Sequence, residues 1–210
     1  MKKGLFISFE GIEGSGKSTQ AKLLKEYLLK SKYNVVLTVE PGGTLIGEEI
    51  RRILLSLENK NMLPKTELLL YNASRAQHIE ELILPSLEDG KVVITDRFTD
   101  STIAYQGYGR GIDLSLILDI DRIVNNSLRP DVTILLDLDV EEGLRRNRGI
   151  NKRDRLEFEE IEFHKRVRVG YLEIASKERD RIKIIDASGS IEDVHEKIKC
   201  IITEVLERWG

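Results

Sequence analysis

Short apolar runs alternate with longer amphipathic segments along this chain. Five runs of mainly β-branched and other apolar residues stand out, at 4–9, 35–39, 91–95, 132–138 and 181–185. Because each run is almost continuously apolar rather than alternating, it predicts a strand buried on both faces, as in a parallel sheet.

The segments between these runs repeat their apolar residues with the period of a helix. They cover 18–31, 46–57, 65–88, 114–127, 140–147, 155–178 and 191–208. Strands that alternate with helices predict a layered α/β fold. A length of 210 residues suits one hydrophobic core, so we expect a single domain over 1–210.

Polar residues follow three of the predicted strands. Glu40 and Pro41 follow the second, Asp96 and Arg97 follow the third, and Asp186 follows the fifth. Ligands of open parallel sheets bind outside the carboxyl ends of the strands. These residues are therefore site candidates by position alone.

The segment FEGIEGSGKST, residues 9–19, follows the first predicted strand and opens the first predicted helix. Residues 11–18, here called the phosphate loop, fit G-x-x-x-x-G-K-[ST], a pattern whose backbone N–H groups close around phosphate oxygens at a helix N-terminus. In such a loop Lys17 reaches the β- and γ-phosphates, and the Ser18 hydroxyl ligates Mg²⁺. The alternative is a glycine-rich turn in which Ser18 only caps the helix. The residues expected around the phosphates of a nucleoside triphosphate are Gly11, Ile12, Glu13, Gly14, Ser15, Gly16, Lys17, Ser18 and Thr19.

Composition narrows the class of protein further. The formal net charge is −3, so no global positive field indicates nucleic acid binding. The single cysteine, Cys200, excludes an intrachain disulfide and favours a cytoplasmic setting. No apolar stretch approaches the ~20 residues of a membrane span, and the N-terminus lacks the apolar core of a signal peptide.

Cysteine and histidine show no pattern of metal ligands. Cys200 lies in an apolar periodic segment and is expected to be a buried bystander. His78, His164 and His195 have no ligand spacing with it, and we expect ordinary surface or helix residues at all three positions.

Several motifs, in order along the chain, resemble those of thymidylate kinases. They are FEGIEGSGKST at 9–19, EPGG at 40–43, DRF at 96–98, STIAYQG at 101–107, GRGID at 109–113 and the arginine-rich stretch 145–155, which runs into DRLE. The resemblance implies a P-loop kinase fold, with a five-stranded parallel sheet, helices on both faces and a short lid over about 145–156. It also implies transfer of the γ-phosphoryl group of ATP to dTMP with Mg²⁺, giving dTDP and ADP, by an enzyme that is usually a homodimer.

DRF offers groups for the acceptor phosphate and the metal. The guanidinium of Arg97 is a planar, permanently charged fork that suits a phosphate, and Asp96 at a strand end suits Mg²⁺. A purely structural Asp–Arg pair is the alternative. The resemblance implies that Arg97 grips the monophosphate and that Asp96 lies near the phosphates and the metal.

The predicted helix 65–88 carries an aromatic ring and an arginine on one face. Tyr71 and Arg75 are four residues apart, so the ring can stack on a pyrimidine while the arginine donates to a carbonyl. A cation–π pair on a solvated face is the alternative that spacing alone favours. The resemblance implies base recognition by this pair, with Thr102 and Gln106 lining the base and Tyr105 against the 2′ position of the sugar.

The resemblance also assigns roles to the turn after the second strand and to the loop carboxylates. Glu40 and Pro41 would form a tight turn beneath the nucleotide, often with a cis peptide bond, which the sequence does not decide. Arg51 would point into the acceptor pocket, although a surface arginine is the alternative beside Arg52. Glu13 would face the acceptor, either to take the 3′-OH proton or to hold a phosphate-binding arginine.

Some thymidylate kinases carry an arginine in the phosphate loop, where this chain has Gly14. Residues 145–155 hold five arginines and one lysine, which resembles members that supply the charge from a lid; a solvated basic loop is the alternative. Arg153 is the favoured catalytic arginine, followed by Arg148. Arg145 or Arg146 would cover the adenine, near Asp186.

Two other functions remain open at this stage. The first is another nucleoside monophosphate kinase, acting on UMP, CMP or AMP. The second is a nucleotide-dependent switch that only senses ATP, in which the acceptor motifs would have no purpose.

Overall fold

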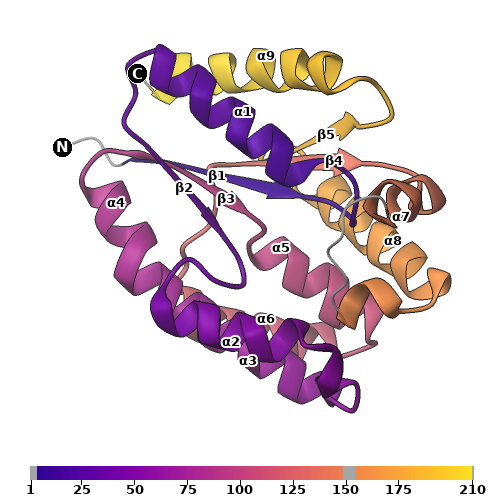
Figure 1. Cartoon of the computed structure of the whole chain (residues 1–210). Coiled ribbons are helices and arrows are strands. Elements are labelled where there is room, and N and C mark those ends of the chain that lie inside the picture. The colour runs from indigo at the N-terminus through magenta and orange to yellow at the C-terminus, as the bar shows by residue number, and fades with distance from the viewer. Residues whose placement is uncertain (1–3, 149–154, 210) are drawn as a thin grey trace.

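A single parallel sheet forms the centre of the molecule (Figure 1). The structure, a computed structural model, describes residues 4–148 and 155–209. The strands lie in the order β2-β3-β1-β4-β5, and every neighbouring pair is parallel. Their bounds are β1 (Leu5–Glu10), β2 (Val35–Val39), β3 (Val92–Asp96), β4 (Val132–Asp137) and β5 (Ile182–Asp186). The prediction of a five-stranded parallel sheet is therefore confirmed.

Helices cover both faces of this sheet, as predicted. Figure 1 shows α1 and α9 on one face, and the layer of α2, α3 and α6 together with α4, α5 and α8 on the other. The α-helices are α1 (Lys17–Lys30), α2 (Leu45–Leu55), α3 (Pro64–His78), α4 (Leu84–Glu88), α5 (Thr99–Thr102), α6 (Leu114–Asn125), α7 (Val140–Arg148), α8 (Ile161–Lys177) and α9 (Ile191–Trp209). Short helical segments are η1 (Leu57–Asn59), the π-helical η2 (Ile79–Ile83) and η3 (Ile103–Gly109), and η4 (Arg155–Phe158).

The structure differs from the predicted helices in three places. The expected helix 65–88 is α3 and α4 joined through the π-helical η2, so the chain stays helical throughout. The expected helix 155–178 is divided into η4 and α8. The segment 99–109, which no pattern predicted as helical, forms α5 and η3, and its polar start and two glycines explain why it was missed.

Burial along α9 corrects the prediction for Cys200. The buried stripe of this helix is Val194, Ile198, Ile202 and Leu206, which recur every four residues and face the core. Cys200 lies outside that stripe and is exposed, so the expectation of a buried thiol was wrong. Among the described residues, no helix is long and apolar enough to cross a membrane.

Candidate active site

The phosphate loop connects β1 to α1 at the carboxyl edge of the sheet. Gly14 and Gly16 have φ angles of 75° and 92°, in the left-handed region that glycine adopts without a steric penalty. Lys17 is buried at the start of α1, and its Nζ donates to the carbonyl oxygen of Ile12 at 2.7 Å. Burial, then the nearby charge of Arg97, lowers the pKa of Lys17 to about 8.

No room exists for a side chain at position 14. A Cβ built on Gly14 would overlap the backbone carbonyl of Gly143 in α7, far inside van der Waals contact. The close approach of α7 and the positive φ angle together require glycine here.

Two oxygen ligands for a divalent cation meet beside the loop. The Ser18 hydroxyl donates to a carboxylate oxygen of Asp96, which ends β3 and is 9% exposed. Mg²⁺ prefers oxygen ligands, keeps several waters, and takes only one or two protein groups beside substrate phosphates. The donor set therefore fits Mg²⁺.

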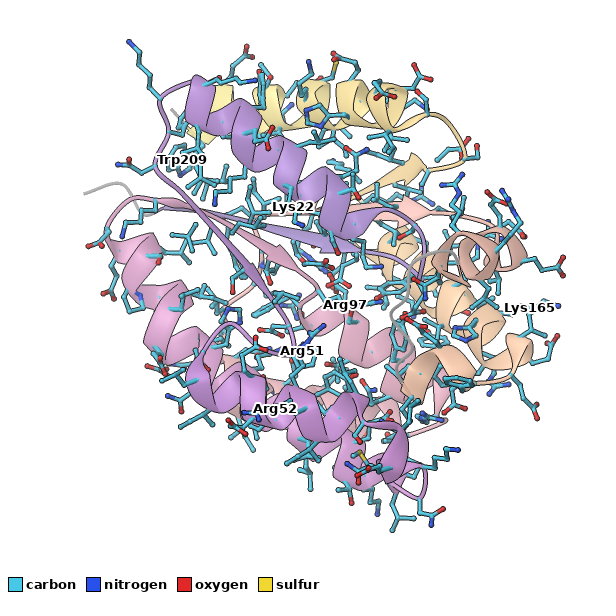
Figure 2. All side chains as sticks on the ribbon, viewed as in Figure 1. Lys22, Arg51, Arg52, Arg97, Lys165 and Trp209 are labelled. Carbon is cyan, nitrogen blue, oxygen red and sulfur yellow. The ribbon has the colours of Figure 1, made fainter. Side chains whose placement is uncertain are left out.

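Arg97 lies near the centre of the molecule (Figure 2) and is the centre of the hydrogen-bond network on the acceptor side. Its φ angle of 77° turns the side chain from the end of β3 back toward the phosphate loop. Nη2 donates to Glu13 at 2.8 Å and to the Tyr105 hydroxyl at 3.0 Å, and Nη1 donates to the Tyr171 hydroxyl at 3.1 Å. The guanidinium thus has a fixed orientation.

Glu13 is held between Arg97 and two residues of the network. The Tyr105 hydroxyl donates to its carboxylate at 2.6 Å, and Nδ1 of His164 lies 3.5 Å from Oε2. Burial raises the pKa of Glu13, but the charge of Arg97 and the other partners lower it further, so the pKa lies well below its usual range. Glu13 is therefore an ionised partner of Arg97.

Glu10 lies behind the same arginine in a different environment. It accepts from the backbone N–H of Phe98 at 2.7 Å, from the Ser101 hydroxyl at 2.6 Å and from the Tyr171 hydroxyl at 3.0 Å. Burial, followed by the charge of Asp100, raises the pKa of Glu10 to about 7.

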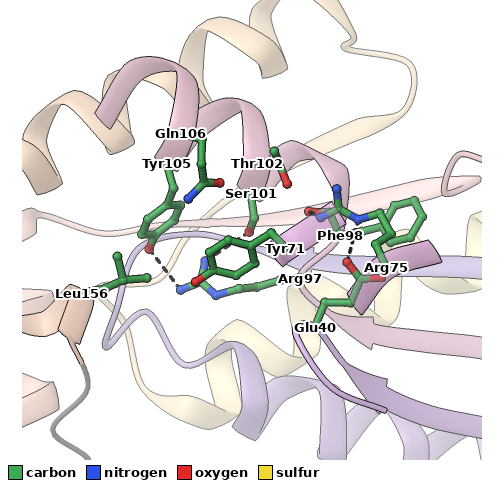
Figure 3. A pocket seen from close by; sticks show the side chains of 10 residues that line it. All are labelled: Glu40, Tyr71, Arg75, Arg97, Phe98, Ser101, Thr102, Tyr105, Gln106 and Leu156. Atoms are coloured by element: carbon green, nitrogen blue, oxygen red, sulfur yellow. Dashed lines mark hydrogen bonds and ion pairs between the residues drawn. The ribbon is translucent and has the colours of Figure 1, made fainter. Parts of the chain in front are cut away.

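A small pocket opens beside Arg97, and Figure 3 shows the side chains that line it. We call it the acceptor pocket; its lining residues are Glu40, Tyr71, Arg75, Arg97, Phe98, Ser101, Thr102, Tyr105, Gln106 and Leu156. A larger hollow, the donor hollow, is lined by the phosphate loop, Pro41, Arg51 and Asn147. Glu40, Tyr71, Arg97 and Leu156 line both, so the two spaces adjoin.

The acceptor pocket contains buried polar atoms that lack a hydrogen bond. Arg75 is buried and donates from Nε to Glu40 at 2.8 Å and from Nη2 to the carbonyl oxygen of Phe98 at 3.1 Å. Its Nη1 has no hydrogen-bond partner and lies 3.8 Å from the carboxylate of Asp121. Thr102 Oγ1 is also unpartnered. Buried polar groups are usually satisfied, so both atoms have hydrogen-bonding capacity that the described residues do not use.

The turn beneath this pocket is built from EPGG. The Glu40–Pro41 peptide bond is cis, which the sequence left open. Arg51 points inward and donates to the Pro41 carbonyl at 2.6 Å, whereas Arg52 points outward and pairs with Glu49 (Figure 2). His78 fixes Glu40 from behind through Nδ1 at 2.9 Å.

The predicted lid residues are only partly described. Arg153 lies outside the described residues, as does the side chain of Arg148. Arg145 is exposed and pairs with Glu142; Arg146 pairs with the same carboxylate and also donates to the carbonyl oxygens of Ala187 and Ser188, in the loop after β5. Asp186 accepts from the backbone N–H of Ser188 in the same loop.

Sequence reasoning missed Ser101, His164 and Tyr171. All three histidines lie in helices, in agreement with the expectation of surface or helix residues, but His78 and His164 are fully buried, which the sequence did not predict; His195 is partly exposed. His164 and Tyr171 are seven residues apart and share the face of α8 that packs on the site. The sequence pattern that could have indicated both residues is this spacing of two polar aromatic side chains on one face of a helix.

The fold and site together define a P-loop nucleotide kinase. The chain belongs to the thymidylate kinase family, since the family model described as "Thymidylate kinase" matches residues 9–198. It is 53% identical over 199 residues to the thymidylate kinase of Halothermothrix orenii, which covers 93% of this chain and 95% of that protein. It is 47% identical over 206 residues to that of Kosmotoga olearia, covering 98% and 99% respectively.

A solved structure agrees with this assignment. The crystal structure of thymidylate kinase from Ehrlichia chaffeensis superposes with a TM-score of 0.78 and 41% sequence identity, covering 96% of this chain and 99% of that one.

Proposed function

We infer that this protein is a dTMP kinase that transfers the γ-phosphoryl group of ATP to dTMP, giving ADP and dTDP. The observation that carries this function is the junction of two spaces: a phosphate loop lines the donor hollow, and a pocket with unpartnered buried polar atoms adjoins it. Arg97 lies at the junction, where the phosphoryl group would move. No observation favours UMP, CMP or AMP, or a switch without an acceptor.

On the donor side, the phosphate loop and the N-terminus of α1 would bind the triphosphate through backbone N–H groups. Lys17 would turn from the Ile12 carbonyl to the β- and γ-phosphates. Ser18 and Asp96 would hold Mg²⁺, which when bound neutralises charge on the phosphates. The remaining proposed ATP-binding residues are Gly11, Ile12, Glu13, Gly14, Ser15, Gly16, Thr19, Arg145 and Asp186.

On the acceptor side, the free donor of Arg75 fits a pyrimidine carbonyl, with Tyr71 stacking on the ring. Thr102 and Gln106 would bond the edge of the base, and Tyr105 would lie against the sugar. Arg97 and Arg51 would bind the monophosphate above the turn at Glu40 and Pro41.

Glu13 is proposed to hold Arg97 rather than to accept the 3′-OH proton. The attacking group of dTMP is an oxygen of its 5′-phosphate, so the reaction needs no base at the 3′-OH, and the lowered pKa of Glu13 makes it an ionised partner for a guanidinium instead. The 2.8 Å hydrogen bond from Arg97 supports the positioning role directly.

The lid arginines are proposed to supply the charge that the phosphate loop lacks. An arginine at position 14 has no space against Gly143, which supports a source elsewhere. We favour Arg153, with Arg148 second. Arg153→Ala should lower kcat on the order of a hundred-fold while changing the KM for dTMP much less. An unchanged kcat would contradict this assignment.

A homodimer in the cytoplasm is proposed as the working form. Large apolar side chains are exposed on α2, α3 and α6, which pack side by side (Figure 1). A single cysteine suits a reducing compartment.

The decisive experiment is a coupled ADP-release assay with ATP, Mg²⁺ and a panel of dTMP, dUMP, UMP, CMP and AMP. We expect dTMP to give the highest kcat/KM, and ATP turnover to depend on the acceptor. Equal turnover of UMP and dTMP would contradict the sugar contact of Tyr105. ATP turnover without any acceptor dependence would contradict the kinase function.

A further inference from the structure

Glu67 of α3 is the centre of a buried polar cluster beside the acceptor pocket. Its side chain is 0% exposed, and four N–H groups donate to it. Oε1 accepts from Gln106 Nε2 at 2.9 Å and from Arg110 Nε at 3.1 Å. Oε2 accepts from Arg110 Nη2 at 3.1 Å and from Arg155 Nη2. Since a carboxylate offers about four acceptor positions, Glu67 is fully occupied.

Two guanidiniums keep Glu67 in its ionised form. Burial raises the pKa of Glu67, but hydrogen bonds and charge from Arg110, with contributions from Gln106 and Arg155, bring it below its usual value. Arg110 is held in turn by Glu159 at 2.6 Å, and Arg155 donates to the Leu54 carbonyl at 3.1 Å. Glu67 is therefore a fixed acceptor without a proton to donate.

This acceptor decides which way the Gln106 amide points. A glutamine amide has one donating end and one accepting end and can be turned through 180°. An ionised carboxylate only accepts, so Gln106 must turn Nε2 to Glu67. Among residues 4–148 and 155–209 no group donates to Gln106 Oε1, and Gln106 lines the acceptor pocket (Figure 3). The pocket thus offers an acceptor at Gln106 and a donor at Arg75 Nη1.

We propose that Glu67 is a positioning residue for base selectivity, which orients Gln106 so that Oε1 accepts the N3–H of a pyrimidine whose neighbouring carbonyl bonds Arg75. Glu67 does not touch the substrate and acts only through Gln106. The inference rests on the proposed dTMP kinase function and adds to it the residue that sets the hydrogen-bonding direction of the base site.

The test compares dTMP with 5-methyl-dCMP, which has nearly the same shape but accepts rather than donates at N3. In the wild-type enzyme the ratio of the two kcat/KM values should be roughly ten to a hundred, because Oε1 is left unpaired by the analogue. Glu67→Gln should lower this ratio several-fold, because an amide at 67 can donate or accept and no longer fixes which end of the Gln106 amide faces the base.

A charge-conserving exchange provides the rescue. In Glu67→Gln/Gln106→Glu the carboxylate at 106 accepts from the amide at 67 and still presents an oxygen to the base, so the ratio should return to within about threefold of wild type. The matched control is Glu159→Gln, which removes a carboxylate from Arg110 but not from Gln106, and should leave the ratio unchanged.

Each outcome decides between a positioning and a structural role. If Glu67→Gln lowers both kcat/KM values equally and leaves their ratio unchanged, Glu67 is only structural and the inference is overturned. A wild-type ratio near one overturns it as well. If Glu67→Gln yields no folded protein, the double variant decides: a restored ratio supports the inference and a ratio near one overturns it. A wild-type enzyme inactive on dTMP overturns the proposed function together with the inference, whereas activity without discrimination overturns only the inference.

Discussion

Two carboxylates three residues apart, at the start of one loop, differ in their affinity for a proton. Glu10 accepts from neutral donors only, and burial followed by the charge of Asp100 raises its pKa to about 7. Glu13 is also buried, but it contacts Arg97 directly and its pKa is lowered well below the usual range. Direct contact with a cation, rather than burial, therefore decides which carboxylate is charged at neutral pH.

The free energy of unfolding of Glu10→Gln, relative to that of wild type, should be higher at about pH 8 than at about pH 5. Between about pH 4.5 and about 7 the folded state keeps a proton on Glu10 that the unfolded state has released. The contribution of Glu10 to the free energy of unfolding is thus greatest at low pH and is lost as the pH rises through about 7. The difference between variant and wild type should grow by about 2 kcal/mol over this interval, measured by urea unfolding.

Glu13→Gln is the matched control for this titration. Its folded-state pKa is lowered, so its stabilising contribution is already complete above its unfolded pKa. The destabilisation by Glu13→Gln should be nearly the same at both pH values. A constant difference for Glu10→Gln as well would contradict the raised pKa.

Arg97→Lys should lower kcat/KM for dTMP on the order of a hundred- to a thousand-fold. A lysine has no planar fork and cannot keep the contacts to Glu13, Tyr105 and Tyr171 while also facing a phosphate. Steady-state kinetics measures the loss. Arg168→Lys, at a guanidinium that pairs with Asp137 on the same side of the sheet, should change activity by less than threefold. Equal effects at both positions would contradict the role of Arg97.

At the scale of elements, the close packing of η3 against α8 assembles the acceptor side. Gly109 of η3 lies where a Cβ would come within 2.7 Å of the Phe163 ring, and Gly170 of α8 lies equally close to Tyr108. Small residues on both elements therefore let them approach each other. This approach brings Tyr171 of α8 to Arg97 and brings Tyr105 of η3 to Glu13.

Gly170→Ala should destabilise the protein by about 1–3 kcal/mol, although alanine has the higher helix propensity by about 1 kcal/mol. The added methyl group would meet Cδ2 of Tyr108 at 2.7 Å and push η3 away from α8. Val169→Ala, at a half-exposed position next to it, should change stability by less than about 0.5 kcal/mol. Urea unfolding of both variants measures the difference, and a neutral or stabilising Gly170→Ala would contradict the tight contact.

Elements with a simple period were predictable, and elements formed by tertiary contact were not. The strands matched to within one residue because continuous apolar runs have no stable place except a buried sheet. The segment 99–109 folds as α5 and η3 although it is polar at its start, because Asp100 is bound by Arg181 at 2.7 Å. Arg181 lies 81 residues away, so no local pattern reports this pair.

The site residues divide in the same way: those in contiguous motifs were predictable from the sequence, and those brought together by tertiary packing were not. The phosphate loop and DRF are contiguous motifs and appear in the sequence with their spacing. Tyr171 and His164 reach Arg97 and Glu13 from α8, which packs on the site only in the folded chain. The orphaned Nη1 of Arg75 becomes visible only once Glu40 and Phe98 are seen to occupy its other donors.

At the scale of the whole molecule, the outer surface of the α2, α3 and α6 layer carries many large exposed apolar side chains. Its exposed apolar side chains include Leu45 at 87%, Leu69 at 57% and Ile123 at 82%. This layer lies on one side of the sheet, away from α1 and α9 (Figure 1). Exposed apolar side chains on packed helices of one layer are typical of an interface, so this layer is where the proposed homodimer would form.

Leu69→Glu should convert the proposed homodimer to a monomer. The side chain lies on α3, in the middle of the layer, and a buried unpaired carboxylate at a symmetric interface would occur twice per dimer. Sedimentation equilibrium should give twice the 24.0 kDa chain mass for wild type and the single-chain mass for the variant. Leu29→Glu, on α1 across the sheet and 47% exposed, carries the same change and should leave the dimer intact. A wild-type protein at the single-chain mass, or a Leu69→Glu variant that stays dimeric, would remove this layer as the interface.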